Sequence, residues 1–143
     1  MKLLLSILTY GIVLAAFASP GAGFAATAEK EAKETKYKEI HTAELKKLID
    51  SKKPFLLFDA RKKITVGVIP GAKPMAYDAS EQAIARAVKP HPKDVMIVVY
   101  CARTECPLSG YLAEDLVEHG YTNVYKYPEG IEDWMKTNPI DKI

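Results

Sequence analysis

Six consecutive apolar residues, Val95 to Tyr100 in "DVMIVVYC", constrain the fold of this chain more than any other stretch. The run is short and rich in β-branched side chains, which favours a strand over a helix. A strand that is apolar at every position is typical of a parallel sheet covered on both faces. A second run, "PFLLFDAR" (54–61), has the same character and also ends in charge. We therefore expect a buried parallel sheet that contains both strands.

Helical patterns alternate with these strands. "HTAELKKLIDS" (41–51) has an apolar face and Thr42 as its expected N-cap, and "SEQAIARAVK" (80–89) has Ser80 in the same role. A third helix is expected from Pro107 to Gly120, followed by a last short strand. The segment between 66 and 79 is rich in turn residues. This order predicts an α/β domain with a mainly parallel central sheet flanked by helices on both faces.

The first 25 residues have the order of a secretory signal peptide. Lys2 is followed by a long apolar run, Pro20 and small residues, with cleavage expected after Gly23-Phe24-Ala25 and Ala26-Thr27-Ala28 as the alternative site. An uncleaved membrane anchor is the competing interpretation, but the run falls short of the roughly 20 residues that span a bilayer. We therefore expect an exported protein, with the periplasm as its compartment.

The remaining chain is expected to form a flexible segment (26–36) and one folded domain (37–143). Lysine and glutamate alternate in "KEAKETKYKE" (30–39), which is typical of a solvated segment. Loss of Lys2 with the signal peptide lowers the formal net charge from +2 to +1. Such a balance gives no support for nucleic-acid binding, and no membrane contact is expected after cleavage.

Two cysteines, Cys101 and Cys106, lie between the strongest strand and the third helix. In an exported chain, two cysteines favour a disulfide. However, a thiol that lies just before a helix N-terminus faces unpaired N–H groups and the positive end of the helix dipole, and both favour the reactive thiolate. Arg103 would favour the thiolate as well, whereas Glu105 would oppose it.

Spacing excludes several other cysteine chemistries. A thioredoxin-like site needs two intervening residues, and four lie between these cysteines. A cysteine phosphatase of the C-x5-R kind needs an arginine where Pro107 stands. Zinc needs about four ligands, and the three histidines are scattered along the sequence. No metal and no organic cofactor are therefore expected.

Several segments together resemble the single-domain rhodaneses, a sulfurtransferase family. The resemblance covers about residues 40–134 and rests on "FDAR" (58–61), "IPGA" (69–72), the Tyr100-Cys101 junction, "HGYTNVY" (119–125) and Trp134. It implies that Cys101 attacks a sulfane-sulfur donor, such as thiosulfate or a polysulfide, and becomes a persulfide. The outer sulfur then passes to a thiol, to cyanide or to a sulfur-carrier protein.

The resemblance also implies an active-site loop whose backbone N–H groups surround the sulfur. Here that loop comprises Cys101, Ala102, Arg103, Thr104, Glu105 and Cys106. Asp59 and Arg61 resemble a family pair, which either shapes the charge around the site or holds its own loop as an ion pair. Ser109, in the first turn of the next helix, either donates to a bound anion or is structural.

The chain also departs from the family pattern. Val68 replaces a usual histidine, Glu129 replaces the first of two usual glycines, and Cys106 stands where a basic residue is often found. Because the loop is only weakly basic, a reduced sulfane donor is favoured over thiosulfate.

Cys106 has three open roles: attack on a Cys101 persulfide, a structural thiol, or a permanent bridge. A bridge needs Cα atoms about 4.4–6.8 Å apart, a range that a loop wrapped around a pocket can miss. Two other functions therefore stand beside sulfur transfer. One is a non-catalytic binding module with the cysteines locked together, and the other is a thiol–disulfide redox protein that uses the same pair.

Overall fold

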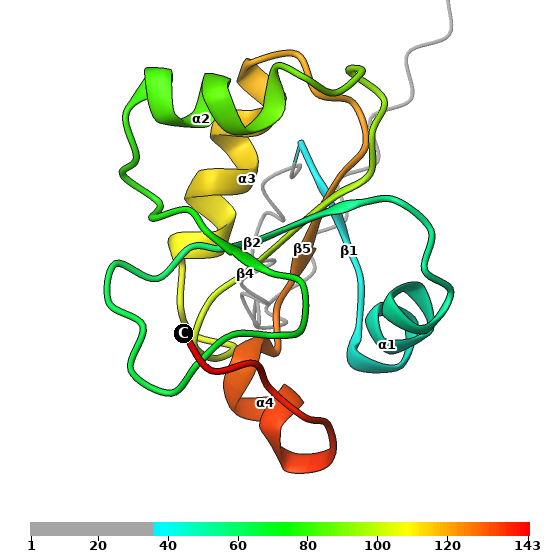
Figure 1. Cartoon of the computed structure of the whole chain (residues 1–143). Helices are drawn as coiled ribbons and strands as arrows, with labels where there is room; N and C mark the ends of the chain where they lie inside the picture. The colour runs from blue at the N-terminus through cyan, green and yellow to red at the C-terminus, as the bar shows by residue number, and fades with distance from the viewer. Residues whose placement is uncertain (1–35) are drawn as a thin grey trace, which may run out of the picture. The chain divides into compact units, whose positions relative to one another are not determined.

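The computed structural model describes residues 36–143 (Figure 1). The expected signal peptide, and the expected flexible segment apart from Lys36, lie outside the described residues. In chain order the elements are β1 (Lys38–Glu39), α1 (Thr42–Asp50), β2 (Leu56–Asp59), β3 (Lys73–Pro74), α2 (Glu81–Val88), β4 (Ile97–Tyr100), α3 (Leu108–Glu118), β5 (Val124–Tyr127) and α4 (Gly130–Thr137). None of the described helices is both long enough and apolar enough to cross a membrane.

The strands form one five-stranded sheet in the order β1-β5-β4-β2-β3, and every neighbouring pair is parallel. Asp59 at the end of β2 pairs with Tyr100 at the end of β4, which pairs with Tyr127 at the end of β5. The three central strands therefore end level with one another. The residues that follow them, including Cys101, emerge together at the carboxyl edge of the sheet, where ligand sites form in folds of this kind.

Alternate residues of the central strands pack into two separate hydrophobic cores, one on each face of the sheet. Phe58 and Val99 pack with apolar residues of α2 and α3 on one face of the sheet, whereas Leu57 and Val98 pack with α1 and α4 on the other. Figure 1 shows the two pairs of helices on opposite sides of the strands. All residues of β2 and β4 are buried. The prediction of a mainly parallel sheet with helices on both faces is therefore confirmed.

The helix caps are predicted correctly in one case and wrongly in another. Ser80 caps α2, and its side chain accepts a hydrogen bond from the backbone N–H of Ala83. In α1 the N-cap is His41, one residue before the predicted Thr42. The Thr42 hydroxyl instead hydrogen-bonds with the Tyr127 hydroxyl, at 2.8 Å, and donates to Asp133, at 2.9 Å. Thr42 therefore links α1 to β5 and α4.

Two short edge strands, β1 and β3, are absent from the prediction. Lys38 and Glu39 lie at the start of the predicted domain, at the end of the lysine- and glutamate-rich stretch, and they pair with β5. Both strands are two residues long and exposed. They therefore carry no apolar pattern, and only tertiary pairing defines them.

Candidate active site

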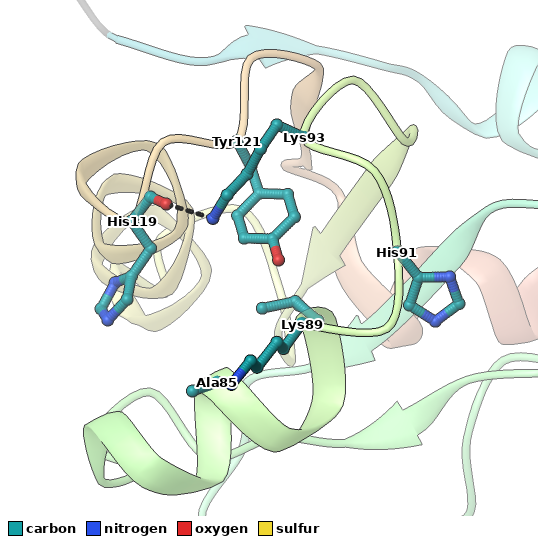
Figure 2. Close-up of a pocket in the computed structure, with 7 residues that line it drawn as sticks. Ala85, Lys89, His91, Lys93, His119 and Tyr121 are labelled. Atoms are coloured by element: carbon teal, nitrogen blue, oxygen red, sulfur yellow. Dashed lines mark hydrogen bonds between the residues drawn. The ribbon is translucent and has the colours of Figure 1, made fainter.

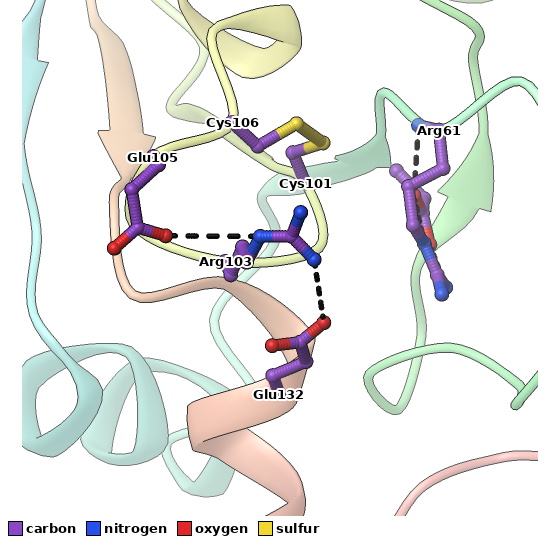
Figure 3. The surroundings of a disulfide bond; sticks show 7 residues. Arg61, Cys101, Arg103, Glu105, Cys106 and Glu132 are labelled. Atoms are coloured by element: carbon purple, nitrogen blue, oxygen red, sulfur yellow. Dashed lines mark hydrogen bonds and ion pairs between the residues drawn. A yellow bond between two sulfur atoms is a disulfide. The ribbon is translucent and has the colours of Figure 1, made fainter.

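The six-residue loop 101–106 connects β4 to α3 at the carboxyl edge of the sheet (Figure 3). Cys101, its first residue, is 1% exposed, whereas Arg103, Thr104 and Glu105 are exposed. The loop thus starts in the core and passes through solvent before it enters α3.

The two cysteines of this loop are joined by a disulfide. Their Cα atoms lie 6.3 Å apart, within the range of about 4.4–6.8 Å that a bridge requires. The hydrogen bond from the backbone N–H of Cys106 to the carbonyl of Arg103, at 3.0 Å, closes a turn that brings Cys106 back towards Cys101. The path of the loop therefore allows the bridge, and the two cysteines are in the oxidised form.

Several backbone N–H groups of the loop have no backbone hydrogen-bond partner among the described residues. Within the part of the chain that the structure describes, no backbone carbonyl accepts a hydrogen bond from the N–H groups of residues 102–105. The first N–H groups of α3 follow directly, with Ser109 buried in its first turn. Several donors are therefore available near the sulfur atoms for an anionic species.

The carbonyl groups of the same loop are bound by the start of α4. The backbone N–H of Ile131 donates to the Cys101 carbonyl and that of Glu132 donates to the Ala102 carbonyl, at 3.0 and 2.9 Å. Gly130 makes this approach possible because its φ is +69° and a Cβ there would lie 2.7 Å from both carbonyl oxygens. The sequence analysis gives Gly130 no role, although a glycine at the start of an amphipathic helix is a visible signal.

Charges of both signs surround the mouth of the loop. Arg103 lies 3.7 Å from Glu105 and 3.5 Å from Glu132 (Figure 3). A shallow hollow of about 250 Å³ extends from this group, and its charged lining residues are Arg103, Glu105, Glu129, Glu132, Asp133 and Lys136. Four carboxylates thus face two cations, and Arg103 is shared between two of those carboxylates. The mouth is a poor site for a dianion.

Asp59 and Arg61 form a buried ion pair on the loop after β2. The Arg61 guanidinium donates to both Asp59 carboxylate oxygens and, at 2.6 Å, to the carbonyl of Gly67. The side chains are 0% and 9% exposed. Both charges are therefore used within the pair, which holds the segment 60–67 against the end of β2. Figure 3 shows Arg61 to one side of the disulfide.

Two tyrosine hydroxyls at the same edge serve as neutral structural groups. The Tyr100 hydroxyl accepts a hydrogen bond from the backbone N–H of Ile69, and burial raises its pKa far above the ordinary value. Burial also raises the pKa of Tyr127 to about 12. Both phenols stay protonated at neutral pH, and their hydrogen bonds hold neighbouring segments around the site.

A contact between His41 and Glu129 lies beside the hollow of about 250 Å³ described above. Nδ1 of His41 lies 2.6 Å from Glu129 Oε1, and this hydrogen bond raises the pKa of His41. The other oxygen, Glu129 Oε2, is buried and has no hydrogen-bond partner among residues 36–143. Glu129 therefore joins the start of α1 to the start of α4, at the position noted above as one where a glycine is usual.

A larger hollow of about 340 Å³ lies at the opposite edge of the sheet (Figure 2). The Lys93 Nζ lies over the ring of Tyr121, 4.0 Å from the ring centroid, and donates a hydrogen bond to the carbonyl of His119. These residues precede β4 and β5, whereas Cys101 follows β4, so the hollow is remote from the cysteine loop. Residues 36–143 contain no cluster of three or more His, Cys, Asp or Glu side chains arranged to hold a metal ion.

Comparison with known protein families gives one match over most of the described chain. A family model described as a rhodanese-like domain matches residues 41–137. This range contains all of the residues discussed above as the site. No curated protein sequence matches the chain.

Solved structures show the same fold. The rhodanese-like domain of a protein from Anabaena sp. is 26% identical, with 73% of this chain and 79% of that one covered and a TM-score of 0.60. A rhodanese-like domain protein from Staphylococcus aureus is 25% identical, with 73% and 99% covered and a TM-score of 0.57. A thiosulfate sulfurtransferase from Pseudomonas aeruginosa is 18% identical, with 73% and 20% covered and a TM-score of 0.62, a likeness of fold alone.

Proposed function

The chain belongs to the rhodanese-like domain family, and from this we propose that it is a sulfurtransferase that carries a sulfane sulfur as a persulfide on Cys101. The observation that carries the proposal is the position of Cys101. It follows a buried central strand and begins a loop whose N–H groups at residues 102–105 donate to no backbone carbonyl of the described chain. An anionic persulfide needs such donors in a site partly screened from water.

The transfer takes place in two displacement steps on the reduced protein. The Cys101 thiolate attacks the outer sulfur of a donor R–S–S⁻, a bond forms between the two sulfur atoms, and RS⁻ leaves. An acceptor nucleophile, such as a thiolate or cyanide, then attacks the outer sulfur of the persulfide. The bond to Cys101 breaks and the Cys101 thiolate is regenerated. No net oxidation of the protein occurs in this cycle.

The charges at the mouth support organic persulfide donors, which are monoanions, over thiosulfate. Thiosulfate is a dianion, and the hollow beside the loop presents four carboxylates and two cations. Arg103 is already paired with Glu105 and Glu132. A donor with less charge is repelled less strongly. Small sulfane donors and thiol acceptors, or a sulfur-carrier protein, are therefore the partners that we propose.

We also propose that the protein acts outside the cytoplasm, in the periplasm. The order of residues 1–25 supports export. A disulfide between Cys101 and Cys106 fits an oxidising compartment. A reductant must then be available there before Cys101 accepts sulfur.

The proposed function is tested by comparing the wild type with Cys101→Ser and Cys106→Ser variants. Each protein is reduced, freed of reductant and given polysulfide with cyanide, and thiocyanate formation is measured. We expect no transfer by Cys101→Ser, because an alcohol is a poor nucleophile at neutral pH. Cys106→Ser should retain transfer. Unchanged unfolding curves control for loss of fold, and turnover by Cys101→Ser would overturn the proposal.

A second candidate function is thiol–disulfide exchange, and the Cys101–Cys106 bridge is the observation that favours it. A redox protein of this kind has a reversible bridge with a defined potential. Equilibration in a stepped glutathione series should then shift the oxidised fraction gradually. A bridge that does not respond to the series would remove this candidate. If the reduced protein also took up no sulfur, a binding module would be the better description.

A further inference from the structure

Cys106 lies where it can react with a sulfur carried by Cys101. The disulfide shows that the two Sγ atoms reach bonding distance in this fold. The turn closed by the Arg103–Cys106 hydrogen bond keeps the second cysteine facing the first. Both cysteines lie on one short loop with α4 packed against its first two residues. The approach of Cys106 to Cys101 therefore needs no movement of a helix or a strand.

We propose that Cys106 is the resolving thiol of this protein, so that its product is hydrogen sulfide when no other acceptor captures the sulfur. This inference rests on the proposed acceptance of sulfur by Cys101. It assigns a chemical role to the residue that stands where a basic side chain was expected. It also distinguishes this chain from a simple carrier, in which the persulfide waits for an external acceptor.

The resolving step balances without any further oxidant. The Cys106 thiolate attacks Sγ of the Cys101 persulfide, and the Cys101–Cys106 bond forms as the bond to the outer sulfur breaks. The outer sulfur leaves with the electron pair and takes a proton from water to become HS⁻. The sulfane sulfur is thus reduced to sulfide while the two thiols are oxidised to the disulfide that the structure contains.

Unequal exposure of the two cysteines decides where the reductant attacks. Cys101 is 1% exposed, whereas Cys106 is partly exposed. An external thiol therefore reaches Cys106 Sγ, and the Cys101 thiolate leaves. Among residues 36–143, no backbone carbonyl accepts from the N–H groups of residues 102–105, so these groups and the start of α3 favour this leaving group by stabilising its charge.

A second external thiol then attacks the mixed disulfide and releases the Cys106 thiolate. The external reductant, a low-molecular-weight dithiol or a protein dithiol, is oxidised to its disulfide. Over one full cycle, one sulfane sulfur and two thiols give one sulfide and one disulfide.

A single-turnover experiment tests the resolving role. Wild type, Cys106→Ser and Cys106→Ala are reduced, freed of reductant and mixed with one equivalent of an organic persulfide, whose displaced group is a thiolate and not sulfide. Both free sulfide and intact protein mass are followed over time. We expect the wild type to release one sulfide and to end as the bridged protein. Both variants should accumulate a Cys101 persulfide and release no sulfide beyond the uncatalysed background.

The outcomes separate this inference from the proposed function. A wild-type persulfide that persists as long as that of the variants would overturn the resolving role and leave sulfur acceptance intact. Failure of all three proteins to gain sulfur would overturn both. Limiting thiol added to oxidised wild type, followed by acid quenching and alkylation, tests the entry point of the reductant. We expect the added thiol on Cys106 and the alkyl group on Cys101, and the reverse would overturn entry at Cys106.

Discussion

The backbone N–H of Ile131 donates a hydrogen bond to the carbonyl oxygen of Cys101, with 3.0 Å between the two atoms. The next N–H of α4 does the same for Ala102. The N-terminal N–H groups of a helix have no partners within the helix, and here two of them hold the first residues of the cysteine loop. The start of α4 is therefore part of the scaffold that positions the sulfur chemistry.

Gly130→Ala should weaken both the fold and sulfur acceptance. The new Cβ would lie 2.7 Å from the carbonyl oxygens of Cys101 and Ala102, and the positive φ adds about 1–2 kcal/mol of strain. Gly71→Ala is the matched control, since Gly71 also has a positive φ but no atom within 4 Å of the added Cβ. Chemical unfolding and persulfide formation are measured for both. Equal loss of sulfur acceptance in both variants would contradict the scaffold role.

Asp59→Asn should be strongly destabilising because it leaves the buried Arg61 guanidinium without its charge partner. Loss of one member of a buried pair costs about 3–5 kcal/mol. Asp78→Asn is the control, because its ion pair with Lys62 is exposed and should contribute little. Urea unfolding of both variants gives the comparison. If the two free energies of unfolding fell equally, the Asp59–Arg61 pair would not have the structural role described here.

Much of this fold is predictable from the sequence because its strands are apolar at every position. Val98 and Val99 face opposite cores, and each must be apolar for that reason. By contrast, Lys38 is exposed in a strand that only its pairing with β5 defines. Thr42 shows a similar limit. Its type is right for an N-cap, but contacts with Tyr127 and Asp133 from distant parts of the chain determine its hydrogen bonds.

The candidate site was predictable in position but not in detail. The end of β4 and the following helix indicate where Cys101 lies, since these features are local in sequence. The contact between Gly130 and the Cys101 carbonyl joins residues 29 positions apart in the chain and leaves no periodic signal. Spacing also left the bridge open, because the path of a six-residue loop depends on turns such as that from Arg103 to Cys106.

Glu132→Gln should improve the use of thiosulfate. The change removes one negative charge from the mouth and releases Arg103 from a 3.5 Å ion pair. We expect kcat/KM for thiosulfate to rise about two- to fivefold, which corresponds to the interaction free energy of an exposed ion pair. The gain should shrink at high salt, because salt screens the charges. Glu118→Gln at the far end of α3 removes the same charge and should have no effect. An equal rise in both variants, or none in Glu132→Gln, would contradict the charge argument.

The contact between His41 and Glu129 should make stability depend on pH. The hydrogen bond to Glu129 raises the pKa of His41, so the folded state binds its proton more tightly than the unfolded chain does. The contribution is fully present below the unfolded pKa, about 6.5, and is lost as the pH rises through the raised folded pKa.

Titration of the His41 ring by nuclear magnetic resonance checks this prediction. In Glu129→Gln the pKa of His41 should fall, whereas Glu39→Gln, which removes a carboxylate with a smaller effect, should lower it less. The stability difference between wild type and Glu129→Gln should also shrink with rising pH across the same range. A His41 midpoint that did not change in Glu129→Gln would show that the contact is absent in solution.

The most direct test of the account is the mass of the purified protein, reduced and freed of reductant, before and after brief exposure to polysulfide, with peptide mapping of both cysteines. Cys106→Ser is measured beside the wild type, so that resolution to the bridge does not hide the intermediate. The account predicts that one sulfur atom is gained and that it lies on Cys101. A reduced Cys106→Ser protein that gains no sulfur, or gains it elsewhere, would contradict the claim that Cys101 is the sulfur carrier.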